Sequence, residues 1–194
     1  MFKKSHINLA GYLVDNLELE DVASHRRSLY IGSILPDCVP SFLTRKHRYE
    51  ETFDILKEDV HKVTDDYDVS RGINSYYCLH LGVISHYLAD YFTYPHNTIF
   101  EGGLKAHCAY ETRLKKVFYQ YVHSDEAKAS AQSHLRFETT DVLFDFIART
   151  HDQYLAAVRQ IRVDCEYIVS LVYQVIDAIV NYFEVRMQMQ VLPA

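Results

Sequence analysis

The sequence contains no tryptophan and is poor in glycine and proline. Only 6 of its 194 residues are glycine and 4 are proline, which disfavours a loop-rich β architecture and favours long helices. Its 4 cysteines are widely separated and form no CxxC pair, so we expect neither a zinc ribbon nor a dense disulfide framework. These absences together predict an all-α protein with reduced thiols.

An excess of basic residues is also absent. The formal net charge is −6 at pH 7, so the chain lacks the positive charge that duplex nucleic acid attracts. No apolar run approaches the length that we expect of a membrane span. The apolar stretch near the N-terminus is interrupted by Asn8 and is followed by acidic residues rather than by a cleavage site. We therefore expect no transmembrane segment, no export signal and a cytoplasmic location.

The composition is that of a globular protein, with 48% hydrophobic and 24% charged residues. The length fits a single domain over residues 1–194. Hydrophobic periodicity predicts a bundle of six or seven helices, with Ser5 as the N-cap of the first. The segment 33–45 holds two prolines and is expected to be a loop, and 124–136 has no clear pattern. The expected helices span about 5–16, 20–32, 47–63, 76–93, 104–122, 138–159 and 163–189.

Ionisable residues interrupt the most apolar of these helices. His86 and Asp90 lie four residues apart, so both side chains project from one helix face and can reach the same ion. The spacing recurs in His107 and Glu111, eleven residues after His96. Burying so many ionisable groups is costly unless they are paired or coordinate metal. A polynuclear metal site inside a helical core would remove that cost.

Candidate ligands also lie upstream of these pairs. Imidazole and carboxylate ligands without a thiolate suit zinc in a hydrolytic site, where two bridged ions can hold a phosphoryl group and activate water. Each residue alone has an ordinary explanation, such as a core histidine, a surface ion pair or a turn aspartate. Their ordered combination carries the inference. The eight candidates are His6, Asp37, His47, His86, Asp90, His96, His107 and Glu111.

The order of these residues forms a motif, Gly82-x-x-x-His86-Tyr87-x-x-Asp90-x-x-x-x-Pro95-His96 followed by His107-x-x-x-Glu111, with His6, Asp37 and His47 upstream. This motif resembles that of the zinc-dependent phospholipase C family. The single-strand-specific zinc nucleases of fungi and plants share the superfamily. The resemblance covers about residues 6–111. It implies an all-helical fold with two or three zinc ions at the base of a cleft, where activated water attacks a phosphodiester.

The resemblance also implies how the ligands divide among the ions. Asp37 would in addition be a general base that accepts a proton from the attacking water. In secreted relatives an N-terminal tryptophan donates its amine and carbonyl to the third zinc, and since this chain has no tryptophan, the third site is expected to be altered or empty. The implied division is Asp37, His47, His86 and Asp90 for one zinc, His96, His107 and Glu111 for a second, and His6 with a bridging Asp90 for a third.

Several alternatives remain for the function. A phospholipid is the substrate that the resemblance favours, and the alternative is a single-strand nuclease or small-molecule phosphodiesterase. The acidic balance and the lack of basic segments with interleaved aromatics argue against long nucleic acids. A further alternative is a non-catalytic zinc-binding protein, whose ions would be fully ligated by protein. Apart from His80, which shares the long apolar helix with His86, the histidines outside the motif, His151 among them, lie in polar contexts and are expected to be solvated.

Overall fold

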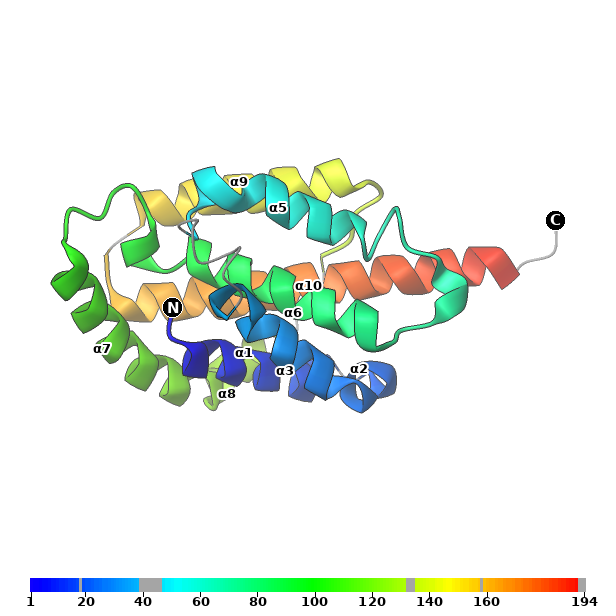
Figure 1. Ribbon diagram of the computed structural model, residues 1–194, viewed down its shortest axis with the longest axis horizontal. Coiled ribbons are helices and arrows are strands. Elements are labelled where there is room, and N and C mark those ends of the chain that lie inside the picture. Colours follow the sequence, from blue (N-terminus) through cyan, green and yellow to red (C-terminus); the bar gives the residue numbers. More distant parts are fainter. Residues whose placement is uncertain (18, 39–46, 132–134, 158, 192–194) are drawn as a thin grey trace.

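The computed structural model describes residues 1–17, 19–38, 47–131, 135–157 and 159–191 (Figure 1). Within these ranges the protein has nine α-helices, three 3-10 helices and no strand. The elements are α1 (Lys3–Asn16), α2 (Glu20–Ser24), α3 (Arg26–Ile34), η1 (Leu35–Asp37), α5 (Tyr49–His61), η2 (Val69–Arg71), α6 (Ser75–Tyr91), η3 (Tyr94–His96), α7 (Leu104–Val122), α8 (Asp125–Ser130), α9 (Thr140–Ala156) and α10 (Ile161–Val191).

The all-α prediction is confirmed, but the expected number of six or seven helices is too low. The expected helix 20–32 is divided because His25 leaves the helical conformation (φ −103°, ψ 19°), and its ring Nδ1 lies 3.0 Å from the carbonyl oxygen of Asp21. α8 forms because the Ser124 side chain accepts a hydrogen bond from the Ala127 N–H, as an N-cap does. α1 begins before Ser5, which therefore lies inside the helix and is not its N-cap.

The segment expected to be a loop over 33–45 starts as helix. α3 continues to Ile34, and η1 follows directly with Pro36 in its first turn. A proline is tolerated there because the N–H that it lacks would have no intrahelical partner. The remainder of that expected loop, from 39 onward, lies outside the described residues.

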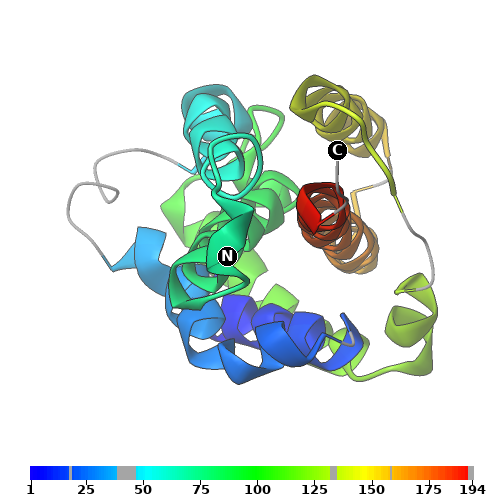
Figure 2. The same ribbon diagram turned by 90° about the vertical axis from the view of Figure 1, so that its right-hand side faces the viewer.

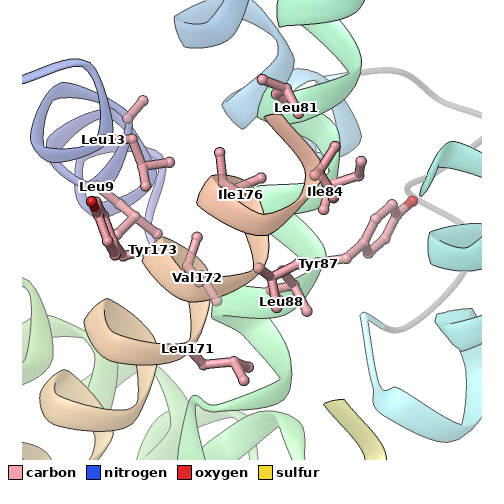
Figure 3. Close-up of a cluster of buried hydrophobic side chains, with 14 of the residues drawn as sticks. Leu9, Leu13, Leu81, Ile84, Tyr87, Leu88, Leu171, Val172, Tyr173 and Ile176 are labelled. Atoms are coloured by element: carbon pink, nitrogen blue, oxygen red, sulfur yellow. The ribbon is translucent and has the colours of Figure 1, made fainter. Parts of the chain in front are cut away.

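The helices form three layers, and α6 and α10 make up the middle layer. In Figures 1 and 2, α5 and α9 lie on one side of this central pair, while α1 and α3 lie on the other. α6 is buried over most of its length, with 13 of its 17 residues buried, and Asn74 caps its exposed start by accepting from two backbone N–H groups. Figure 3 shows side chains of α1, α6 and α10 meeting in the core, among them Leu13, Ile84 and Ile176.

α10 extends two residues beyond each end of the expected helix 163–189, and the expectation that no apolar run approaches the length of a membrane span is wrong for this helix. By length and composition alone it could cross a membrane, and 61% of its most apolar window is buried inside the protein. A core helix of a folded protein passes the same test. Packing against α6, α7, α8 and α9 buries most of its apolar residues up to Phe183, while Val185, Met187 and Met189 near its end are exposed. The absence of a membrane span stays a prediction.

α3 and α6 approach so closely that only glycine fits between them. A Cβ on Gly82 would lie 2.3 Å from a backbone oxygen of α3, and a Cβ on Gly32 would lie 2.0 Å from a backbone oxygen of α6. Real side chains do not tolerate such distances. This crossing places the carbonyl of Ser33 beside the ring of His86, one turn after Gly82, with 2.8 Å between oxygen and Nδ1. The fold thereby orients a predicted metal ligand.

Candidate metal centre

Asp90 lies at the middle of a cluster of ionisable side chains near the end of α6. The residue is completely buried. Its Oδ1 lies 3.4 Å from Nε2 of His6, and its Oδ2 lies 3.0 Å from Nδ1 of His47, 3.3 Å from Nε2 of His86 and 3.7 Å from Nδ1 of His96. Oδ1 thus faces one ring nitrogen and Oδ2 faces three, and the four rings come from different parts of the chain. This is the arrangement of a carboxylate that can bridge two metal ions.

The charge state of Asp90 follows from these neighbours. Burial by itself raises the pKa of the carboxyl group, but attraction to His96, the Met1 amino group, His86 and His6 outweighs burial and holds the pKa well below its usual value. Asp90 is therefore ionised at neutral pH. An ionised and buried carboxylate requires positive charge close by, which protonated side chains or metal ions can supply.

His86 is oriented by the backbone of α3. Its Nδ1 donates a hydrogen bond to the Ser33 carbonyl oxygen at 2.8 Å, because a carbonyl can only accept. A neutral His86 then carries its lone pair on Nε2, which lies 3.0 Å from Nδ1 of His47. A ring nitrogen fixed by a second hydrogen bond in this way is the usual arrangement of a histidine that ligates metal.

His6 gives the most direct indication that a group belongs in this cluster. Its ring stacks on that of His86, with 3.9 Å between centroids and 16° between planes. Both of its ring nitrogens are buried, and neither has a hydrogen-bond partner among the described residues. Burial, together with the neighbouring His86, lowers the pKa of His6 to about 3. The approach of Nε2 to Oδ1 of Asp90 at 3.4 Å is not a hydrogen bond. A buried, neutral imidazole without a hydrogen bond is costly, and coordination to a zinc ion would satisfy it.

His96, His107 and Glu111 form a second group of ligand atoms. The Nε2 atoms of His96 and His107 lie 3.0 Å and 3.1 Å from Oε1 of Glu111. His107 and Glu111 are one turn apart on α7, as the spacing predicts, while η3 supplies His96. Burial raises the pKa of Glu111, but hydrogen bonds from His107 and His96 outweigh it and lower the pKa. The group thus contains an anionic carboxylate between two imidazoles.

Asp37 lies at the exposed edge of the cluster. Its Oδ1 is 3.8 Å from Nδ1 of His47 and 3.9 Å from Nε2 of His86. Its side chain is 24% exposed, compared with 1% for Asp90 and 9% for Glu111. Asp37, His96, His107 and Glu111 line a cavity of about 550 Å³. The cluster is therefore open to solvent on this side.

The amino group of Met1 enters the same cluster, although it is not one of the eight ligands predicted from the sequence. Its nitrogen lies 2.5 Å from Oδ1 of Asp90, 3.0 Å from Nε2 of His96 and 3.1 Å from Oε1 of Glu111. Burial lowers the pKa of this amine, but Asp90 and Glu111 outweigh burial and raise it. The resemblance could have predicted this group, since the N-terminal tryptophan of secreted relatives contributes its backbone amine.

Asp164 of α10 supports both segments that carry the second group. Its carboxylate accepts hydrogen bonds from the N–H of Tyr94 at 2.9 Å, the hydroxyl of Tyr110 at 2.8 Å and the hydroxyl of Tyr154 at 2.9 Å. Tyr94 begins η3, which contains His96, and Tyr110 directly precedes Glu111. Burial raises the pKa of Asp164 to about 6, although these hydrogen bonds oppose the shift. No pattern in the sequence pointed to this residue.

The expectation that His151 is solvated is wrong. The residue is 2% exposed, its Nε2 lies 2.8 Å from Oδ1 of Asn97, and its ring stacks on Tyr49. Asn97 in turn donates to the carbonyls of Tyr91 and Thr93. His151 therefore helps to hold the turn between α6 and η3.

The structure brings all eight predicted ligands together. Among the described residues their ligand atoms form three groups, and the atoms within each group lie within 4.8 Å of one another. His6 joins Asp37 and His86, which differs from the division that the resemblance implies. The assignment of residues to individual ions stays a prediction. The groups are His47, His86 and Asp90; His6, Asp37 and His86; and His96, His107 and Glu111.

The sequence model of one protein family, zinc-dependent phospholipase C, matches residues 5–161 of the chain. The chain belongs to this family. The match contains all eight candidate ligands and reaches the first residue of α10, so the family predicted from the motif is confirmed. Comparisons with curated proteins and with solved structures find no match. Membership in the zinc-dependent phospholipase C family supports a zinc-dependent, phospholipase C-like hydrolase.

Proposed function

We propose that the protein is a phosphodiesterase of the phospholipase C type, which uses two or three zinc ions to activate water for attack on a phospholipid. The observation that carries the proposal is the convergence of three groups of ligand atoms around Asp90, beside an open cavity. The ligands are imidazoles and carboxylates, which suit zinc in hydrolytic sites. The ring of His6, whose two nitrogens make no hydrogen bond among the described residues, supports a bound ion at the most buried part of the cluster.

Zinc bound in this cluster would lower the pKa of a water molecule and stabilise the negative charge that develops on the phosphoryl oxygens. The chain's own residues hold the geometry for this reaction. Ser33 orients His86, and the ionised Asp90 lies between the groups. Asp37, the most exposed of the three carboxylates, is the residue that we assign to accept the proton of the attacking water.

A purely structural zinc site is the principal alternative. A structural ion is enclosed by its protein ligands, whereas a catalytic ion keeps a position open for water and substrate. Here Asp37 and His107 are partly exposed, with side chains 24% and 29% accessible, and the cavity adjoins them. This exposure supports the catalytic function.

Elemental analysis of zinc-loaded protein tests the metal centre. We expect two or three zinc ions per chain and fewer than one in Asp90→Asn, because every group lies near the lost carboxylate charge. Asp59→Asn is the matched control, since Asp59 is a buried aspartate that pairs with Lys62 and His80 outside the cluster. A folded Asp90→Asn protein that retains all of its zinc would contradict the proposed ligand set.

Turnover assays test the reaction and separate the substrates. The zinc-loaded protein is incubated with short-chain phospholipids and, in parallel, with a single-stranded oligonucleotide. Release of a phosphorylated headgroup supports the phospholipase C-type reaction, while cleavage of the oligonucleotide supports the nuclease alternative. If no phosphodiester or phosphomonoester is hydrolysed, the proposed enzyme function is wrong.

A further inference from the structure

The cavity beside the metal centre is rich in lysine. The chain as a whole is acidic, with a formal net charge of −6, yet Lys3, Lys4 and Lys115 line this cavity. Among the described lining residues the only carboxylates are Asp37 and Glu111, which bound zinc would neutralise. A ligand that enters the cavity would therefore meet a net positive surface.

Lys115 is placed by the same helical spacing that places the metal ligands. His107, Glu111 and Lys115 follow one another at intervals of four on α7, so they share one face of the helix. The Lys115 side chain is half-buried, and its Nζ lies 5.6 Å from the ring centroid of Phe2. This contact keeps the ammonium group next to the segment that leads to the Met1 amine.

Lys3 and Lys4 come from the first turn of α1, across the cavity from α7. Lys3 Nζ donates to Sγ of Cys38 at 3.3 Å, and Cys38 directly follows Asp37. In the part of the chain that the structure describes, Lys3, Lys4 and Lys115 take part in no ion pair, whereas Lys57, Lys62 and Lys128 each pair with a nearby aspartate. The charge of these three lysines is therefore available to a ligand.

We propose that the cavity selects phosphoesters whose headgroup carries a second negative charge, such as a further phosphate or a carboxylate, over those with a cationic headgroup such as choline. The inference rests on the proposed function, because the metal centre would hold the phosphate that reacts. The lysines then face the part of the substrate that does not react. Each partly solvated lysine would contribute about a two- to fivefold preference, and added salt would weaken it.

Binding of three small phosphomonoesters to the zinc-loaded protein tests the selectivity without turnover. The ligands share a phosphate and differ in the second group, which is cationic in phosphocholine, neutral in glycerol 3-phosphate and anionic in 3-phosphoglycerate. By calorimetry we expect 3-phosphoglycerate to bind about tenfold more tightly than phosphocholine at low salt, with glycerol 3-phosphate between them. Equal affinities for the three ligands would overturn the inference.

Variants show whether the lysines cause the preference. In the double variant Lys4→Ala, Lys115→Ala we expect the tenfold difference to fall to about twofold. Lys116→Ala is the matched control, because Lys116 is the exposed neighbour of Lys115 on α7 and does not line the cavity; it should leave the difference unchanged. A preference that survives in the double variant would come from the carboxylate binding zinc, and the inference would be wrong.

Turnover separates this inference from the proposed function. The values of kcat/KM are compared for short-chain phosphatidylcholine and short-chain phosphatidylinositol 4-phosphate. Hydrolysis of both at equal rates by wild-type protein would support the proposed function and overturn the charge selectivity. Charge-selective binding without hydrolysis of either would support the selectivity and overturn the proposed function.

Discussion

Replacing Asp164 by asparagine should change how the stability of the protein depends on pH. Burial raises the pKa of this carboxyl group from 3.8 to about 6, and the side chain is 2% exposed. A carboxyl group whose pKa is raised on folding binds its proton more tightly in the folded state. It therefore stabilises the fold below pH 4, and this contribution is lost as the pH rises to about 6. The shift corresponds to about 3 kcal/mol.

Asparagine removes the titration while it keeps the size of the side chain. The amide oxygen can accept from the Tyr94 N–H and the Tyr110 hydroxyl, and the amide nitrogen can donate to the Tyr154 hydroxyl oxygen. Urea unfolding of both proteins, freed of metal by a chelator, is measured from pH 4 to pH 8. We expect the free energy of unfolding of the variant, relative to wild type, to rise by about 2.4 kcal/mol between pH 4 and pH 7.5, since part of the shift lies below pH 4.

The comparison with wild type is needed because other carboxyl groups change the stability with the opposite sign at the acidic end of the titration. Asp90 and Glu111 have pKa values lowered from 3.8 and 4.5, so their stabilisation is lost as the pH falls below these ordinary values, and it cancels in the difference. Tyr154→Phe supplies a second check. It removes a hydrogen bond that lowers the pKa of Asp164, so the decrease in stability with rising pH should become steeper. A difference between Asp164→Asn and wild type that does not vary with pH would refute the reasoning.

Three further predictions concern the elements around the metal centre. Gly82→Ala should lower the free energy of unfolding by about 3 kcal/mol or more in urea titrations, because its Cβ would meet the backbone of α3. Gly103→Ala, whose Cβ would meet nothing within 4 Å, should change it by less than about 1 kcal/mol. One glycine added before Met1 should reduce the zinc content in elemental analysis, and an unchanged content would argue against the amine as a ligand. Burial lowers the pKa of His47, but Asp90 outweighs burial and raises the pKa above 6.5. As the pH is lowered, protonation of His47 should therefore weaken zinc binding before pH 6.5 is reached, as measured by competition with a chelator. An affinity independent of pH would contradict this.

The parts of the site that could be predicted from the sequence depend on local geometry. A helix places residues four apart on one face, so the spacing of His86 and Asp90, and that of His107 and Glu111, already predicted which atoms would converge. The distance of 3.3 Å between Nε2 of His86 and Oδ2 of Asp90 agrees with this. The convergence of the two pairs with each other required the ordered resemblance, because spacing says nothing about how two helices pack.

The features that were missed depend on contacts between distant segments. Asp164 lies 70 positions after Tyr94, and no periodic pattern links an acidic residue on one helix to a backbone N–H in another turn. His151 was misjudged because its sequence neighbours are polar, whereas its burial is set by Tyr49 on α5 and by Asn97. The division of the expected helix 20–32 into α2 and α3 has a local cause, which is the conformation of His25 (φ −103°, ψ 19°). It could not be predicted because no change in residue composition marks this position.

The Met1 amine shows that the identity of a side chain does not predict a ligand that belongs to the main chain. The absence of tryptophan raised doubt about the third zinc, yet the group that ligates in the relatives is a backbone amine, which any first residue can supply. In the structure the amine lies 2.5 Å from Asp90, and the Met1 side chain is buried at 5% exposure, so methionine fills the space beside the cluster. We therefore expect a third site, where zinc occupies it, to use a backbone amine at this position rather than an indole, and the variant with an added glycine tests this expectation because it displaces the amine.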